Sequence, residues 1–483
     1  MNKKEELAQA EKSYNTVPII FVLMSGAFVA ILNQTLLGTA LPHMMADFHV
    51  DANTVQWLQS IFMLVNGIMI PITAFLIERF TNRGLFLSAI GIFAIGTAIC
   101  ATAPSFSFLM AGRVAQAAGA GIIMPLMQTI LFLIFPIEKR GTAMGMFGLV
   151  IAFAPAIGPT LSGWLVEHFS WRSLFYVVLP IVVIDFIFAY FILKNITKQS
   201  YPKIDIFSVI LSTFGFGGLL YGFSAAGSSG WLSGQVISSL IIGLVAVSWF
   251  IARQLRLDQP ILEFRVFQST TFSLTTVLGM VVFMSMIGGA VILPMLMQNM
   301  LGFSALESGL ALLPGALIQG VTNPISGKLF DKFGAKWLSI IGLTILTVTT
   351  FMLTTLTDHT TFTYLATVNA LRMIGIAMVM MPVTTAGLNQ LPPHLIPHGT
   401  AMNNTMRQIA GAVGTALLVT VMTGTALPEE GVQGFIHGVN ISFFIAGICS
   451  VVALILSLFM KDSAKGDGDR FENRQPQQTI QES

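Results

Sequence analysis

The sequence predicts an all-α membrane protein with fourteen transmembrane helices in a 6+2+6 arrangement. Three observations support this prediction: apolar residues make up 54% of the chain and charged residues 10%, long apolar runs recur along it, and its cations gather in alternate loops. A soluble domain carries roughly a quarter charged residues. Here Phe alone (38) outnumbers Lys and Arg together (24), so we expect most of the surface to face lipid.

Each apolar run is long enough for a membrane helix, which needs about 20 residues. The first run is too long for the apolar part of a signal peptide and lacks a clear cleavage site, so we expect it to be retained. The predicted spans are 17–41, 55–77, 85–103, 107–134, 143–166, 174–193, 205–225, 233–252, 271–297, 307–327, 337–357, 361–386, 401–426 and 436–460.

The cations predict how these spans are oriented. With the N-terminus inside, only Arg172 falls in an outer loop, and Arg113, Arg372 and Arg407 fall within spans; the other Lys and Arg residues lie in inner segments. Enrichment of Lys and Arg marks the cytoplasmic side. We therefore expect a multi-pass cell-membrane protein with both termini in the cytoplasm.

An internal repeat divides the chain further. The segment from Pro71 to Arg83 aligns without gaps with the segment from Pro324 to Lys336, and both copies fall in inner loops. Two halves with the same topology are parallel repeats, a recognised transporter design with the solute site between them. The expected organisation is a cytoplasmic segment, a six-helix bundle, a linker with two extra helices, a second six-helix bundle and a disordered cytoplasmic tail, at 1–16, 17–193, 194–265, 266–460 and 461–483.

Both copies of the repeat carry charged residues at the same positions. In the first copy these are Glu78, Arg79 and Arg83; in the second, Asp331 and Lys332 follow Gly327. We expect charge contacts across the inner face that hold one conformation closed. The alternative is that these charges only set the orientation of the helices.

Two further motifs lie within predicted spans. The fourth span carries Arg113, Gln116, Gly119 and Gly121, and the fifth contains Gly158 followed by Pro159. Pro removes a backbone donor and Gly permits close helix approach, so this pair predicts a bend in the cavity wall. Later spans carry Arg372 and Arg407, the second within a run from Asn403 to Gly411.

Together with the inner-loop repeat, these motifs resemble those of the major facilitator superfamily, and within it the fourteen-helix drug:proton antiporters of the EmrB/QacA type, which include lincomycin-resistance exporters. The resemblance runs from about residue 17 to 460. It implies the major facilitator fold with two pseudo-symmetric halves, and secondary active multidrug efflux by proton-coupled antiport through alternating access. A specific metabolite or siderophore exporter or facilitator of the same fold is the alternative.

Proton coupling in this family needs a group that exchanges a proton near neutral pH. The related antiporters often carry an Asp in the first span, but this chain has Asn33 there. Asp185, deep in the sixth span, and Glu307, at the start of the tenth, are the candidate carboxyl groups, and Arg113 is a candidate to tune the proton site or hold an anion. Arg113 near the outer interface, with its charge reaching water, is the alternative.

Uncharged polar residues within the spans are candidates to contact the solute, and they suit a neutral or weakly basic amphipathic compound: Asn33, Gln34, Asn66, Gln116, Gln128 and Gln298. The sequence holds no nucleotide-binding loop, no catalytic motif and no metal-ligand pattern. We therefore expect no enzyme activity, no cofactor, no metal and no nucleic-acid partner. The expected partners are a drug-like solute, protons and the lipid bilayer, with the protein as a monomer.

Overall fold

The computed structural model describes residues 16–196 and 199–460 and places fourteen long helices in this part of the chain. The N-terminal bundle, as we use the term, consists of α2 (Thr16–Leu36), α4 (Ala52–Arg79), α5 (Asn82–Ala101), α6 (Phe106–Ile134), α7 (Arg140–His168) and α8 (Ser173–Ile192). The hairpin is α9 (Ile206–Ser229) and α10 (Gly234–Gln254). The C-terminal bundle consists of α11 (Thr270–Asn299), α12 (Ala305–Phe333), α13 (Ala335–Met352), α14 (Phe362–Leu388), α15 (Ile396–Gly424) and α16 (Val432–Leu458).

Short helical turns fill several connections. They are η1 (Gly38–Ala40), α3 (Leu41–Phe48), η2 (Ile137–Lys139), η3 (Phe264–Gln268), η4 (Pro393–Leu395) and η5 (Pro428–Glu430). The predicted cytoplasmic segment up to residue 15 and the predicted disordered tail from residue 461 lie outside the described residues.

Thirteen of the long helices in the described part of the chain contain a stretch long and apolar enough to cross a membrane. The fourteenth, α12, has 29 residues but carries polar and charged groups along its length, among them Gln319, Asn323 and Asp331. It is long enough to span, since a helix rises about 1.5 Å per residue, and its mid-helix polar residues Gln319 and Asn323 are buried. The prediction of an all-α fold with fourteen membrane helices is confirmed.

Polar residues cap the starts of several helices. Asp51, Thr81, Ser105 and Thr361 each accept a hydrogen bond from a backbone N–H in the first turn of the helix that follows. Such caps satisfy N–H groups that have no partner within the helix. Two boundaries differ most from expectation. The first span was predicted to reach residue 41, but α2 ends at Leu36. The span predicted to reach residue 357 ends at Met352, whose carbonyl accepts a 2.7 Å hydrogen bond from the Tyr364 hydroxyl.

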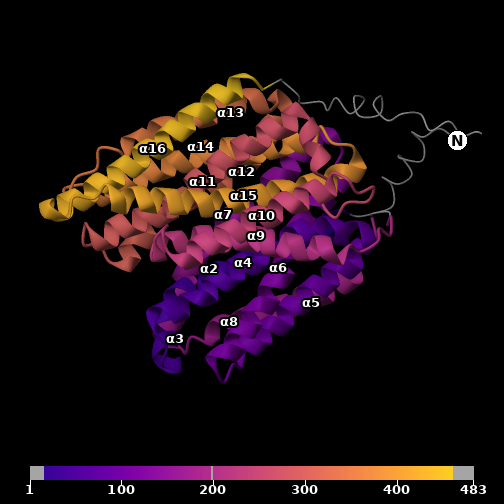
Figure 1. Cartoon of the computed structure of the whole chain (residues 1–483), viewed down its shortest axis with the longest axis horizontal. Coiled ribbons are helices and arrows are strands. Elements are labelled where there is room, and N and C mark those ends of the chain that lie inside the picture. The colour runs from indigo at the N-terminus through magenta and orange to yellow at the C-terminus, as the bar shows by residue number, and fades with distance from the viewer. Residues whose placement is uncertain (1–15, 197–198, 461–483) are drawn as a thin grey trace, which may run out of the picture.

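The two bundles lie side by side, with the hairpin against their seam (Figure 1). Helix α7 packs on α12 and α4 packs on α15, so each bundle offers one pair of helices to the other. Helix α9 contacts both α4 and α15. The hairpin therefore covers one of the two seams.

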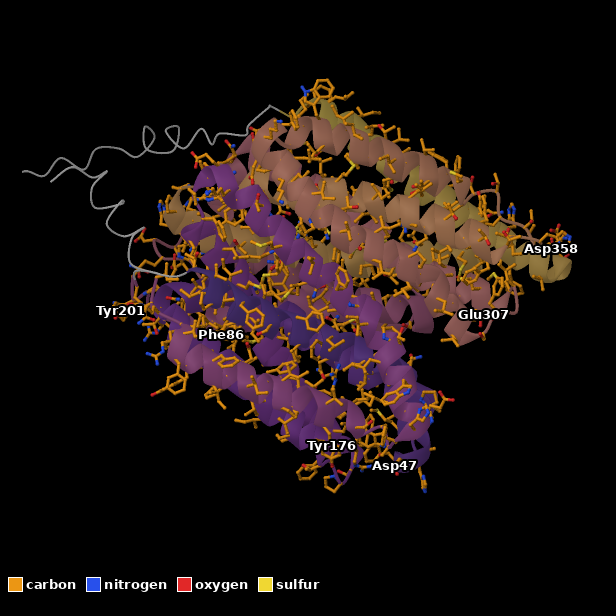
Figure 2. All side chains as sticks on the ribbon, turned by 180° about the vertical axis from the view of Figure 1, so that it is seen from behind. Asp47, Phe86, Tyr176, Tyr201, Glu307 and Asp358 are labelled. Atoms are coloured by element: carbon orange, nitrogen blue, oxygen red, sulfur yellow. The ribbon has the colours of Figure 1, made fainter. Side chains whose placement is uncertain are left out.

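We call the end of the molecule where α4 and α12 finish the basic face, because it carries Arg83, Lys139, Arg140 and Lys332. The other end is the opposite face. Figure 2 shows Tyr201 near the basic face, whereas Asp47 of the N-terminal bundle and Asp358 of the C-terminal bundle lie at the opposite face, far from each other. The bundles thus diverge toward the opposite face.

Candidate functional site

At the basic face, Asp331 on the last turn of α12 bonds to the first turn of α7. Its carboxylate accepts hydrogen bonds from the Gly141 backbone N–H (2.7 Å), the Thr142 backbone N–H (2.8 Å) and the Thr142 hydroxyl (2.5 Å). These donors form the first turn of α7, where unpaired N–H groups and the helix dipole favour a negative charge. Asp331 therefore fastens the end of one bundle to the start of a helix in the other.

Small residues make this contact possible. A Cβ atom at Gly141 would lie 2.4 Å from Asp331 Oδ1, and a Cβ atom at Gly327 would lie 2.2 Å from the Gly141 carbonyl oxygen. Real Cβ contacts are longer than either distance, so α7 and α12 could not approach this closely with larger residues here.

A second contact joins Glu78 at the end of α4 to His398 in the first turn of α15. The distance from His398 Nε2 to Glu78 Oε1 is 2.9 Å, and the Glu263 backbone N–H donates to His398 Nδ1 at 3.2 Å. Because Nδ1 accepts, it carries no hydrogen, so Nε2–H is the group that donates to Glu78. His398 thereby links the two bundles and the segment that leads into α11.

Three more hydrogen bonds cross between the bundles. Arg140 Nη1 donates to Asn389 Oδ1 (3.0 Å), Asn323 Nδ2 to the Gly148 carbonyl (2.7 Å) and Asn404 Nδ2 to Gln128 Oε1 (2.5 Å). Like the Asp331 and Glu78 contacts, all lie in the half of the molecule nearer the basic face. Within the described residues, every side-chain hydrogen bond assigned between the two bundles lies on this side.

The repeat was expected to supply these contacts, and its acidic members make them. Its basic members bond elsewhere: Arg79 Nη1 donates to the Pro202 carbonyl (2.7 Å), Arg83 Nη2 to the Tyr190 carbonyl (2.7 Å), and Lys332 Nζ lies over the Phe333 ring (5.2 Å). The basic residues of the repeat therefore contact the linker or their own bundle.

Arg113 is fully buried in a network of uncharged groups. Its Nε donates to the Leu58 carbonyl (3.1 Å) and its Nη1 to Gln116 Oε1 (2.9 Å), while the guanidinium lies 4.3 Å from the Phe62 ring centre. Gln116 Nε2 donates in turn to Thr97 Oγ1 (2.9 Å) and lies 3.4 Å from Asn33 Oδ1. The alternative of an arginine reaching interfacial water does not fit this burial.

Arg372 and Arg407 are buried in the C-terminal bundle. Arg372 Nη2 donates to the backbone carbonyl and the hydroxyl of Ser285, and Gly289 leaves space for its guanidinium. Arg407 Nη2 donates to the Thr384 hydroxyl and the Met380 carbonyl. Helices α6 and α14, which begin at the opposite face, thus each carry one fully buried arginine.

The two candidate carboxyl groups have different surroundings. Asp185 on α8 is buried against α2 and accepts a hydrogen bond from the Ser25 hydroxyl, and its Oδ2 has no hydrogen-bond partner in the part of the chain that the structure describes. Glu307 is exposed and closes a capping box with Ser304 at the start of α12. Neither is bonded to Arg113, Arg372 or Arg407.

The candidate solute residues fall into two groups. Asn33, Asn66, Gln116 and Gln128 are buried in the helix interior, and Gln34 is half-buried on α2. Gln298 is exposed at the end of α11. Asn33 and Gln116 are brought together with Arg113, and Gln128 bonds across the seam to Asn404.

The Gly158–Pro159 pair does not end α7, which runs unbroken from Arg140 to His168 through Pro155 and Pro159. A Cβ atom at Gly158 would lie 2.2 Å from Thr35 Oγ1 on α2. The glycine therefore permits close packing of α7 on α2 at this depth.

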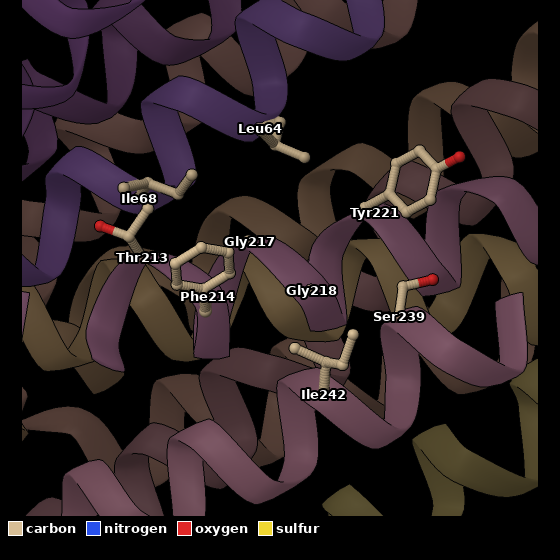
Figure 3. Close-up of a pocket in the computed structure, with 9 residues that line it drawn as sticks. All are labelled: Leu64, Ile68, Thr213, Phe214, Gly217, Gly218, Tyr221, Ser239 and Ile242. Atoms are coloured by element: carbon tan, nitrogen blue, oxygen red, sulfur yellow. The ribbon is translucent and has the colours of Figure 1, made fainter. Parts of the chain in front are cut away.

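A surface pocket of about 320 Å³ lies between α4 and the hairpin and is lined almost entirely by carbon (Figure 3). Its walls include Leu64, Ile68, Phe214, Tyr221 and Ile242. A second pocket, of about 360 Å³, lies at the opposite face beside Asp47 and Trp171. Neither pocket is lined by any of the site residues predicted from the sequence.

Sequence reasoning missed His398, Thr142 and Gly141. His398 lies just before the predicted span 401–426, and that position places it at the basic face. The signal available in the sequence was the position of these residues at or just before the start of spans that follow inner loops, since a helix N-terminus attracts a carboxylate.

With this geometry established, comparison with known proteins decides the family. Residues 23–415 match the family described as the Major Facilitator Superfamily. The chain belongs to the major facilitator superfamily. The two bundles and the seams between them are therefore those of a member of a transporter family.

The relatives of this superfamily member include named bacterial transporters. It is 56% identical over 454 residues to the uncharacterized MFS-type transporter YcnB of Bacillus subtilis (strain 168), covering 93% of this chain and 96% of the relative. It is 42% identical over 470 residues to the lincomycin resistance protein LmrB of the same strain, covering 95% and 98%. Among solved structures, the proton:xylose symporter XylE matches with a TM-score of 0.66 at 14% identity, covering 95% of this chain and 99% of that one, which shows the shared fold.

Proposed function

We propose that this protein exports amphipathic drugs or other toxic compounds by proton-coupled antiport through alternating access. The observation that carries the proposal is the one-sided closure of the molecule: bonds between the bundles gather near the basic face, and the bundles diverge toward the opposite face (Figure 2). A transporter that alternates closes one end while the other opens. The similarity to a lincomycin resistance protein supports a drug as the solute.

The orientation belongs to the proposal. Lys and Arg mark the cytoplasmic side, which places the basic face and both termini in the cytoplasm of a cell-membrane protein. The conformation described here is then outward-facing. In this proposal the gate consists of Asp331 and Glu78, and Gly327 permits the close approach of α7 and α12. Basic residues contact the adjoining segments: Arg79, Arg83 and Lys332.

Buried amides are the proposed solute contacts. Gln128 is the strongest, because it bonds to Asn404 across the seam and its Nε2 has no partner among the described residues. Asn33 and Gln116 belong to the Arg113 network, and Asn66 and Gln34 lie on the neighbouring helices α4 and α2. Gln298 contacts the solute only at the rim in this proposal.

Proton movement is assigned to Asp185, with Arg113 and Glu307 as the other candidates. Asp185 is the only acidic side chain buried inside a long helix of the described chain.

In proteoliposomes, Asp185→Asn should bind drug almost normally but lose drug-induced alkalinisation. Glu307→Gln is the matched control and should be mild, because its carboxylate is exposed. Alkalinisation that survives Asp185→Asn would move the coupling site elsewhere.

The decisive experiment is a susceptibility panel in a pump-deleted host with and without the gene. Drug export predicts resistance to several unrelated compounds, lost in Asp185→Asn. A specific metabolite or siderophore transporter of the same fold would give no resistance. Counterflow in inside-out vesicles would then give the direction of transport.

A further inference from the structure

The segment that leads into the hairpin is attached to the end of α4 at the basic face. The Ser200 backbone N–H donates to the Glu78 carbonyl (3.1 Å), and Arg79 Nη1 donates to the Pro202 carbonyl (2.7 Å). Both bonds fall on the last turn of α4, which also carries the carboxylate that contacts His398. The first arm of the hairpin, α9, is therefore tied to the N-terminal bundle beside the gate.

The two arms of the hairpin are joined at the same end. Asp205, just before α9, accepts hydrogen bonds from Arg253 Nε (2.7 Å) and from the Ser208 hydroxyl (2.7 Å). Gln254, the last residue of α10, donates from its Nε2 to Ser208 Oγ (2.7 Å). Gln254 and Ser208 are completely buried, and a buried polar group that loses its partner is costly. Gln254 therefore holds the end of α10 against the start of α9.

The oxygen of the same side chain binds the stretch of chain that follows the hairpin. Gln254 Oε1 accepts a hydrogen bond from the Ile261 backbone N–H at 2.7 Å. Two residues further on, the Glu263 backbone N–H donates to His398 Nδ1 at 3.2 Å. Ile261 and Glu263 are both buried. One buried glutamine thus holds the stretch whose backbone contacts the histidine at the gate.

The bond from Glu263 decides which nitrogen of His398 carries the hydrogen. A neutral imidazole has one N–H and one acceptor nitrogen, and the bond that one nitrogen makes sets the state of the other. Because Nδ1 accepts from the Glu263 N–H, Nε2 carries the hydrogen and donates to Glu78 Oε1 at 2.9 Å. In the other tautomer the lone pair of Nε2 would face the Glu78 carboxylate, and two acceptors do not bond. The Glu263 N–H therefore selects the tautomer that makes this contact.

Together these bonds run from one bundle to the other around the seam between α4 and α15. They pass from the end of α4 through 200–202, the facing ends of α9 and α10, and 261–263 to the start of α15. The direct contact between Glu78 and His398 completes the circuit. At the seam between α7 and α12, by contrast, Asp331 bonds directly to the start of α7. The hairpin is therefore bonded to both sides of the α4/α15 seam.

We propose that Gln254 is a positioning residue of the gate, which acts by setting the tautomer of His398. Gln254 holds the stretch 261–263 where the Glu263 N–H meets Nδ1 of the ring, and the Nε2–H group then binds Glu78. This inference rests on the proposed alternating access and gives the hairpin a role in it. The extra pair of helices stabilises the closed basic face through one buried glutamine.

The test measures the opening of the basic face in the full-length protein, by the distance between spin labels at Lys139 and Trp337 in a background free of other cysteines. Gln254→Leu keeps an apolar chain of similar size but cannot bond, so the open fraction should rise about threefold to fivefold. Gln235→Leu, at an exposed glutamine near the start of the same helix, is the matched control and should stay as closed as the wild type. Gel filtration shows that each variant is folded.

Two changes at Glu263 isolate its backbone N–H. Pro has no N–H and fixes φ at about −65°, close to the −84° of Glu263. Glu263→Pro therefore removes the donor to His398 with little change to the backbone, whereas Glu263→Ala loses the same carboxylate but keeps the N–H. Glu263→Pro should open the basic face as Gln254→Leu does, and Glu263→Ala should open it less. This pair decides the question if Gln254→Leu does not fold.

A double-mutant cycle separates positioning of His398 from a general structural role. Because Gln254 acts through His398 in this proposal, adding Gln254→Leu to His398→Ala should open the basic face no further. Full additivity of the two changes would overturn the inference, as would a Gln254→Leu protein as closed as Gln235→Leu or equal distances in Glu263→Pro and Glu263→Ala. Opening in His398→Ala and Asp331→Ala with none in Gln254→Leu contradicts this inference alone, whereas a closed basic face in all three contradicts the proposed alternating access itself.

Discussion

Glu78 and Asp331 occupy the same position of the internal repeat, yet they bind different groups at the basic face. Asp331 is bound by the backbone and hydroxyl of the first turn of α7, whereas Glu78 is bound by the imidazole of His398 in the first turn of α15. The seam between α7 and α12 therefore depends mainly on a helix terminus, whereas the seam between α4 and α15 depends on a single side chain. This difference makes the two contacts separable by mutation.

His398→Ala should open the basic face. The change removes the donor to Glu78, the one bond of His398 that crosses between the bundles, which is worth about 1 kcal/mol, so the open fraction should rise roughly fivefold. Spin labels at Lys139 and Trp337, in a background without Cys100 and Cys449, measure the separation of the bundles. His394→Ala is the control, because this exposed ring has no hydrogen bond to a described residue. Unchanged distances in His398→Ala would show that the contact does not hold the gate.

Asp331→Ala should open the same face more strongly. It removes three charge-assisted bonds and leaves the first turn of α7 without its partner, at a cost of about 2–4 kcal/mol. The same labels should report a larger shift than in His398→Ala. Asp358→Ala at the opposite face is the control. An Asp331→Ala protein as closed as the wild type would refute the gate.

Gly327→Ala should destabilise the protein by about 1–3 kcal/mol through overpacking. The new methyl group would meet the Gly141 carbonyl at 2.2 Å, and backbone cannot give way as a side chain can. Gly309→Ala on the same helix is the matched control, since a Cβ there meets nothing within 4 Å. Thermal unfolding in detergent distinguishes them, and equal unfolding temperatures would argue against close packing at this seam.

Asn33→Asp should raise resistance to cationic drugs. The new carboxylate would lie beside Gln116 in the Arg113 network and would offset the arginine charge. Resistance to cationic compounds in the susceptibility panel should rise about tenfold or more. Asn33→Ser, which changes size without adding charge, is the control. An unaltered substrate range would show that residue 33 does not act on the solute.

Labelling in intact cells tests the orientation. A cysteine at Asp358 should react with a membrane-impermeant maleimide, and one at Lys139 should not, because these positions lie at the opposite face and the basic face. Permeabilised cells should label both. Labelling of Lys139 alone in intact cells would invert the orientation proposed from the cation distribution.

Much of the fold could be predicted because its determinants are local. Span length, apolar composition and caps such as Asp51 and Thr81 act over a few residues, so the helices end close to where they were expected. At the end of α13, which falls short of the predicted span, the Met352 carbonyl accepts a hydrogen bond from the Tyr364 hydroxyl. The repeat likewise showed that Glu78 and Asp331 occupy equivalent positions, but it did not show which residues they bind.

By itself, then, the sequence determined a fourteen-helix membrane protein with two parallel halves and charged motifs in both, since hydropathy and repeats can be read along the chain. Only the tertiary structure decided that Glu78 meets His398, 320 positions away, and that Asp331 meets Gly141, 190 positions away. It also decided that Arg113, Arg372 and Arg407 are buried without a carboxylate, while Asp185 faces Ser25. The physical reason is that pairing and burial depend on which helix faces meet, and hydropathy along one chain does not encode the contacts between bundles.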